Sequence, residues 1–177
     1  MADAPSFDID EWLSRIDLAA VPDPADKLRE CEFFFDLLCR EADRDRFRWL
    51  VSAFMNAAYS FFESSALTAY FRFNDNETGE PVPDSQALEV LRKYVVVIRD
   101  EKRPNFVKTA GLVPLTKQLY EFRKKSTHRH PLSLMATGAA LPESYHFGNM
   151  RGNGTPVMPL CRALVDLLRR VQQEIDE

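Results

Sequence analysis

Apolar residues at helical spacing dominate the middle of the chain. No glycine occurs before Gly79, and no proline lies between Pro24 and Pro81. The chain therefore contains more than fifty consecutive residues without either strong helix breaker. We predict a long helix from about Arg44 to Tyr70, buried on most sides. One of its apolar faces is rich in large side chains (Phe47, Val51, Phe54, Met55, Ala58, Phe61 and Phe62), and the other is smaller (Leu50, Ala53, Ala57 and Ser60).

Two shorter helices are predicted before it. Asp8 and Glu11 match a capping box, which indicates a first short helix that ends before Pro22. Asp23-Pro24 has the N-cap and first-position residues of a second helix. Asp43 and Asp45 mark a tight corner after it, and its buried stripe is predicted to comprise Leu28, Cys31, Phe35, Leu38 and Ala42.

The C-terminal half contains further helical patterns. After a polar turn over 74–83, Asp84 caps a predicted fourth helix that reaches about Arg99, although its β-branched stretch Tyr94–Ile98 also suits a strand. Apolar residues recur again before Pro131, which blocks continuation of that helix. A closing helix is predicted to begin at Thr155-Pro156 or Pro159. Its packed residues are Leu160, Leu164, Leu167, Leu168, Val171 and Ile175.

Between the last two helices, residues 132–159 hold four of the six glycines and three of the eleven prolines. This composition predicts mainly a long loop, with room for a short hairpin. The expected fold over residues 1–177 is therefore one all-α domain, an up-and-down bundle of four to five main helices with a long loop before the C-terminal helix.

Composition and cysteine content indicate a cytoplasmic protein. The 177 residues are 45% hydrophobic, enough for a core without disulfides. Of the three cysteines, Cys31 and Cys39 lie about 12 Å apart on one predicted helix, beyond disulfide reach. We expect three reduced, buried thiols. Because the N-terminus lacks a signal-peptide core and no run approaches the roughly 18 apolar residues of a membrane span, we expect no membrane association.

Charge is unevenly distributed. The formal net charge is −4, which argues against non-specific coating of nucleic acid, because such binding requires a basic surface. Glu121–His130 nevertheless carries four cations against one carboxylate, a local net of +3 before histidines are counted. The alternative interpretation is a solvated basic helix end that complements the helix dipole.

Arg123, His128 and His130 are the candidate chemical groups. Arginine is a permanent cation with a planar set of donors, and histidine exchanges a proton near neutral pH. Five helical positions place His128 about 140° around the axis from Arg123. For the two to share a face, the helix must end or loosen around Ser126-Thr127, as Pro131 suggests.

With its arginine at a helix end and a histidine five residues later, the chain resembles the HEPN superfamily of all-α proteins. Phe47–Phe62 resembles that family's long second core helix, and Lys117–His128 resembles its motif helix. The resemblance, which also takes in the closing helix, covers about two thirds of the chain. One departure is Lys124, where the family commonly has a polar residue such as asparagine.

The resemblance implies a metal-independent endoribonuclease, a toxin or defence component without cofactor, whose site forms across a homodimer. His128 would act as general base toward a ribose 2′-hydroxyl, and Arg123 would stabilise charge on the phosphate. RNA would be contacted by Lys124, Lys125, Arg129 and His130. The partner would be RNA, with a cognate antitoxin or nucleotidyltransferase as a further one.

A non-catalytic helical module that binds a protein or nucleotide is the alternative. Arg123 then caps helix carbonyls or pairs with a carboxylate, and His128 and His130 are structural or solvent-exposed. His146 is expected in a loop, packed between aromatic neighbours. Other chemistries have less support, because the chain has no nucleotide-binding glycine loop, no nucleophile motif and no recognisable metal-ligand spacing. Its phenylalanine-rich segments are expected in the core.

Overall fold

The computed structural model describes residues 24–72, 86–99, 107–128, 132–136, 142–148 and 154–177. Within them the chain forms a mostly helical domain with two small antiparallel sheets, so the predicted helical fold class is confirmed. The predicted helix near Asp8, the turn over 74–83 and the Asp84 cap lie outside the described residues. The helices are α2 (Pro24–Leu38), α3 (Arg44–Arg72), α4 (Gln86–Tyr94), α5 (Pro114–His128) and α6 (Val157–Asp176). The strands are β1 (Val95–Arg99), β2 (Val107–Gly111), β3 (Leu134–Ala136), β4 (Tyr145–Phe147) and β5 (Thr155–Pro156).

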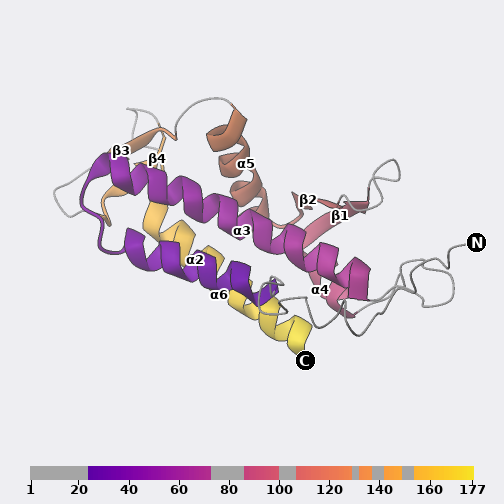
Figure 1. Ribbon diagram of the computed structural model, residues 1–177. Coiled ribbons are helices and arrows are strands. Elements are labelled where there is room, and N and C mark those ends of the chain that lie inside the picture. The colour runs from indigo at the N-terminus through magenta and orange to yellow at the C-terminus, as the bar shows by residue number, and fades with distance from the viewer. Residues whose placement is uncertain (1–23, 73–85, 100–106, 129–131, 137–141, 149–153) are drawn as a thin grey trace, which may run out of the picture.

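Helix α3 is the spine of the domain, because each of the other four described helices contacts it. Figure 1 shows α2 running along one side of α3 and α5 standing on another. The large apolar face predicted for α3 is confirmed, since all seven of its residues are buried. They share one core with the buried leucines and valines of α6. No helix among the described residues is both long and apolar enough to span a membrane.

The corner between α2 and α3 is where the sequence predicted it. The Asp43 carboxylate accepts hydrogen bonds from the backbone N–H groups of Asp45 (3.0 Å) and Arg46 (2.9 Å), and so satisfies two donors that the first turn of α3 leaves unpaired. Helix α2 ends at Leu38, however, and Ala42 is exposed in the corner. Including Ala42 in the buried stripe of α2 was therefore wrong.

The prediction that the fourth helix reaches Arg99 was also wrong. Helix α4 stops at Tyr94, and the following five residues form β1, which pairs antiparallel with β2 from Val95↔Gly111 to Arg99↔Val107. The β-branched Val-Val-Val-Ile run loses little side-chain freedom in a strand and can pair with a second one. The strand preference of this run therefore prevailed over continuation of the helix.

Residues 132–156 contain more regular structure than the predicted loop with a short hairpin. Strand β4 pairs with both β3 and β5. The Tyr145 ring stacks on Phe47 with centroids 4.5 Å apart, so β4 closes the end of the core near the start of α3. After β4 the chain turns at Gly148, whose φ of 146° is one that side chains disfavour.

All three cysteines are free thiols. Cys31 and Cys161 are buried in the core, as expected. Cys39 is exposed, because α2 has ended at Leu38 and Cys39 lies in the corner that follows. Its predicted burial was therefore wrong.

Candidate functional site

Helix α5, which carries the candidate motif, is held at its start by the buried Thr116 hydroxyl. This hydroxyl accepts hydrogen bonds from the backbone N–H groups of Leu112 (3.1 Å) and Val113 (3.2 Å) and donates to the Tyr94 carbonyl oxygen (2.8 Å). Gly111 allows the close approach, since a Cβ there would overlap the backbone of Thr116. The start of α5 is thereby fixed to the junction between α4 and β1.

Arg123 lies two turns further along α5, at its contact with α3. Its guanidinium carbon is 4.3 Å from the centroid of the Tyr59 ring on α3, a cation–π arrangement. The side chain is half-buried, and its Nε atom is fully buried. Arg123 is therefore a cation seated on an aromatic face, and its position is defined by packing.

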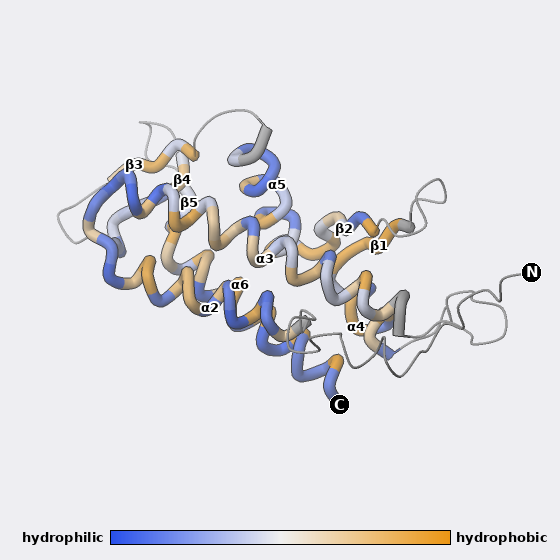
Figure 2. Tube along the Cα trace, viewed as in Figure 1, coloured by the Kyte–Doolittle hydropathy of each residue, from blue (hydrophilic) through white to orange (hydrophobic). Residues whose placement is uncertain are grey.

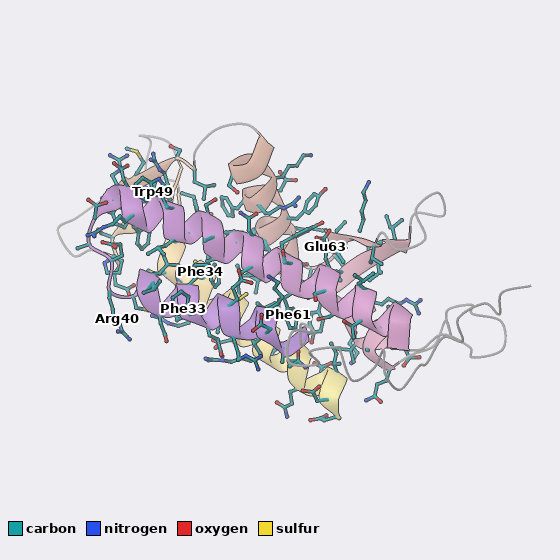
Figure 3. The ribbon with its side chains drawn as sticks, in the orientation of Figure 1. Phe33, Phe34, Arg40, Trp49, Phe61 and Glu63 are labelled. Atoms are coloured by element: carbon teal, nitrogen blue, oxygen red, sulfur yellow. The ribbon has the colours of Figure 1, made fainter. Side chains whose placement is uncertain are left out.

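Tyr59 is itself fixed from two directions. Only 6% of the residue is exposed, and its hydroxyl donates a hydrogen bond to the Thr109 carbonyl oxygen of β2 at 3.2 Å. Tyr120, one turn before Arg123, contacts the Tyr59 ring at a centroid distance of 6.0 Å. Burial first, and then the nearby Glu63 carboxylate, raise the pKa of Tyr59, so the phenol stays neutral at physiological pH. Figure 3 labels Glu63 on α3.

Helix α5 continues through Ser126 and Thr127 and ends at His128. The Ser126 hydroxyl donates to the Arg123 carbonyl oxygen (2.9 Å), a bond that is compatible with continued helix. The expected loosening before His128 was therefore wrong. Positions 123 and 128 of this continuous helix lie about 140° apart around its axis.

The remaining predicted contacts of the motif are only partly described. Lys124 and Lys125 are exposed, and the hydrophilic last turns of α5 are visible in Figure 2. The Lys125 ammonium lies 5.6 Å from the centroid of the Phe122 ring. The His128 side chain and the whole of Arg129 and His130 lie outside the described residues.

His146 belongs to strand β4 and not to a loop, so that expectation was wrong. Its residue is 8% exposed, and its ring packs against Gly154, where a Cβ would collide with it. Phe147, the next residue, stacks on Phe122 of α5 at a centroid distance of 4.0 Å. Strand β4 thus supports the turn that carries Arg123.

A second surface feature lies where α2 ends and α3 begins. A groove of about 500 Å³ is lined by the apolar residues Leu37, Trp49, Leu50 and Ala53, with arginines beside them. Trp49 is 62% exposed, and Phe33 on α2 is 59% exposed, so placing all the phenylalanines in the core was wrong for Phe33. Figure 3 shows both side chains on α2 and the start of α3.

Sequence reasoning missed two contributors to these surfaces. Tyr59 was not singled out because periodicity cannot tell which buried aromatic meets a cation on a distant helix. Trp49 falls between the two apolar faces of α3, and this position was the available signal for its exposure.

Comparisons with known proteins gave no match: no family model, no curated protein and no solved structure is significantly similar to the chain. Among the described residues, no group of three or more His, Cys, Asp or Glu side chains is placed to hold a metal ion.

Proposed function

We propose that the protein is an HEPN-like RNA-binding domain that contacts RNA phosphates through the C-terminal half of α5. The observation that carries this proposal is the seating of Arg123 on Tyr59 beside the exposed Lys124 and Lys125. A half-buried guanidinium held by packing suits a directed phosphate contact. Lys124 and Lys125 leave the same turn of α5 in other directions and add positive charge to this end of the helix. Because the whole chain is acidic, binding is confined to this local basic surface.

The proposal extends to RNA cleavage only in a two-copy form. Positions 123 and 128 lie about 140° apart around the axis of α5, and cleavage requires both groups at one phosphate. Two copies that bring Arg123 of one chain near His128 of the other supply both groups. His128 then removes the 2′-hydroxyl proton, and Arg123 stabilises charge on the phosphate as the hydroxyl oxygen attacks the phosphorus. The bond from phosphorus to the 5′-oxygen breaks, the leaving oxygen takes a proton from water, and the product is a 2′,3′-cyclic phosphate.

Fluorescence anisotropy with a labelled single-stranded RNA tests binding. Arg123→Ala should weaken affinity roughly tenfold or more, because a hydrogen bond to a charged group contributes about 1.5–3 kcal/mol. It should also lower the slope of log affinity against log salt by about 0.7, the value for one phosphate contact on a single strand. Arg169→Ala is the matched control, since it removes one exposed arginine of α6 that pairs with Glu32 at 2.7 Å.

Equal binding by wild type, Arg123→Ala and Arg169→Ala would contradict the proposal. Equal weakening by both substitutions would indicate a response to net charge alone.

Cleavage is tested separately by incubating RNA with wild type and with the Arg123→Ala, His128→Ala double variant in EDTA. RNA decay that is lost in the double variant supports the two-copy ribonuclease. Mixing the single variants Arg123→Ala and His128→Ala should restore part of the decay, because a mixed dimer retains one intact Arg123–His128 pair. Equal RNA decay with the wild type and the double variant would contradict RNA cleavage by this protein. RNA binding would then still be decided by the anisotropy measurement.

The second candidate is a non-catalytic interaction module, and the groove beside Trp49 is the observation that favours it. Exposed Trp49 and Phe33 add apolar area of the kind enriched at protein interfaces. If RNA does not bind at low salt, where phosphate contacts are strongest, this second function is the better account.

A further inference from the structure

We infer that Tyr59 is a positioning residue for Arg123, and that the contribution of Arg123 to RNA binding depends on the Tyr59 ring. The inference rests on the proposed function and adds to it a residue on another helix, distant in sequence from the motif. It is drawn from the 4.3 Å stack of the guanidinium on the ring and from the anchoring of the ring itself.

The Tyr59 ring contacts one face of the Arg123 guanidinium. A guanidinium is planar, and its N–H donors lie in that plane. When one face rests on an aromatic ring, the in-plane donors are not consumed by the stack. The stack on Tyr59 itself uses none of these donors, and of them the Nε–H is buried.

The Tyr59 ring also limits the conformations of the Arg123 side chain. A free arginine side chain has many rotamers, and binding a phosphate requires most of them to be given up. In this structure the Tyr59 ring is held by α3 at one end and by the Thr109 carbonyl of β2 at the other. Seating Arg123 on a ring that is fixed twice removes much of that freedom before RNA arrives, which favours tighter binding.

The Tyr59 side chain is uncharged at physiological pH. Burial, and then the Glu63 carboxylate, keep the Tyr59 phenol neutral. The guanidinium lies 4.3 Å from the centroid of the Tyr59 ring, and the neutral hydroxyl donates a hydrogen bond to the Thr109 carbonyl oxygen. Phenylalanine at this position retains the face and loses only the anchor.

A double-mutant cycle in the RNA-binding assay tests the inference. Tyr59→Leu should weaken RNA binding severalfold while Arg123 is present and should have no further effect in an Arg123→Ala background. Tyr59→Phe should lie nearer to wild type. Additive losses of RNA affinity from Tyr59→Leu and Arg123→Ala would overturn the inference, as would wild-type affinity for Tyr59→Leu. Neither result contradicts the proposed RNA binding.

Because Tyr59 is buried, Tyr59→Leu is used only where circular dichroism shows a folded helical protein at the assay temperature. Arg123→Lys provides a test that leaves the core untouched. Lysine keeps the charge but lacks the planar face, so its affinity should fall close to that of Arg123→Ala. Wild-type affinity for Arg123→Lys would overturn the inference, because a cation without a planar guanidinium stacked on the ring would then be sufficient.

A nuclear magnetic resonance measurement separates positioning from RNA binding. In wild type and Tyr59→Phe, the Arg123 side-chain protons should be shifted upfield by the ring beneath them. That shift should be absent in Tyr59→Leu. An unshifted Arg123 in wild type would overturn positioning, whereas a shifted Arg123 together with unchanged RNA binding in Arg123→Ala would retain the stack and reject its role in binding RNA.

Discussion

Helix α3 is packed differently against its two neighbours. Toward α2 the contacts are hydrocarbon, as in the 6.3 Å approach of the Phe35 and Phe54 rings. Toward α5 the contact is polar and aromatic, with Tyr59 carrying the guanidinium of Arg123. The first side derives stability from removing apolar surface from water, and the second keeps a cation at a defined place near the surface. One helix therefore serves as core on one side and as support for a candidate site on the other.

The difference extends to the polar groups on each side. On the α5 side, the Thr116 hydroxyl and the Tyr59 hydroxyl both bond backbone carbonyls across elements. On the α2 side, the polar capping group is Asp43, which lies at the exposed corner. Substitutions on the two sides should therefore destabilise the protein by different mechanisms and by different amounts.

The largest expected effect is on the hydrocarbon side. Phe54→Ala should lower the free energy of unfolding by about 3–5 kcal/mol, because it leaves a cavity in a fully buried position. Urea unfolding followed by circular dichroism measures it. Trp49→Ala, on the same helix but 62% exposed, is the matched control and should change stability by about 0.5 kcal/mol or less. Similar losses from both would mean that Phe54 does not lie in the core.

On the α5 side, Thr116→Val should cost about 1–3 kcal/mol. The substitution keeps the shape of the side chain but removes the hydroxyl from the Tyr94 carbonyl and from the backbone N–H groups of Leu112 and Val113. The Leu112 N–H still donates to the Tyr94 carbonyl oxygen at 3.0 Å, so Val113 loses most. Thr116→Ser keeps the hydroxyl and should recover most of the loss. If serine and valine destabilise the protein equally in urea, packing of the methyl group and not hydrogen bonding fixes the start of α5.

At the corner between α2 and α3, Asp43→Ala should cost about 1 kcal/mol, the usual effect of losing an N-cap. Asp43→Asn retains a capping oxygen and should lie close to wild type. Thermal unfolding at neutral pH compares the three proteins. Wild-type stability for Asp43→Ala would show that the capping bonds are replaced by water.

The packing of α3 on its hydrocarbon side, toward α2, could be predicted from the sequence. Its packing against α5 could not. The spacing of Phe47, Val51 and Phe54 requires only helical periodicity, and the lack of glycine and proline set the length of α3 to within a few residues. The predicted end of α4 was wrong because a helical pattern and a β-branched run overlap at Tyr94. Pairing with β2 decides between helix and strand there. That pairing partner is distant in the sequence.

The candidate site shows the same limit. The motif residues on α5 were found because they are neighbours in sequence. Tyr59 is 64 positions before Arg123, and only the packing of α3 against α5 brings the two together. The Ser126-Thr127 pair was expected to end the helix, yet the Ser126 hydroxyl bonds back to the Arg123 carbonyl within it.

The smallest expected effect on stability concerns the thiols, which report opening of the hydrocarbon side. At pH 8, a maleimide should modify exposed Cys39 rapidly, whereas Cys31 and Cys161 should react only after unfolding in urea. Burial raises the pKa of Cys31 from its ordinary value of 9.0 to about 12. The contribution of the neutral Cys31 thiol to stability is therefore complete below pH 9.0 and is lost as the pH rises toward 12. Mass spectrometry counts the labels, and Cys39→Ser should remove the fast one without changing the unfolding midpoint. Fast labelling of Cys31 in that variant would mean that α2 separates from α3 readily, and the hydrocarbon side would then be the less stable of the two.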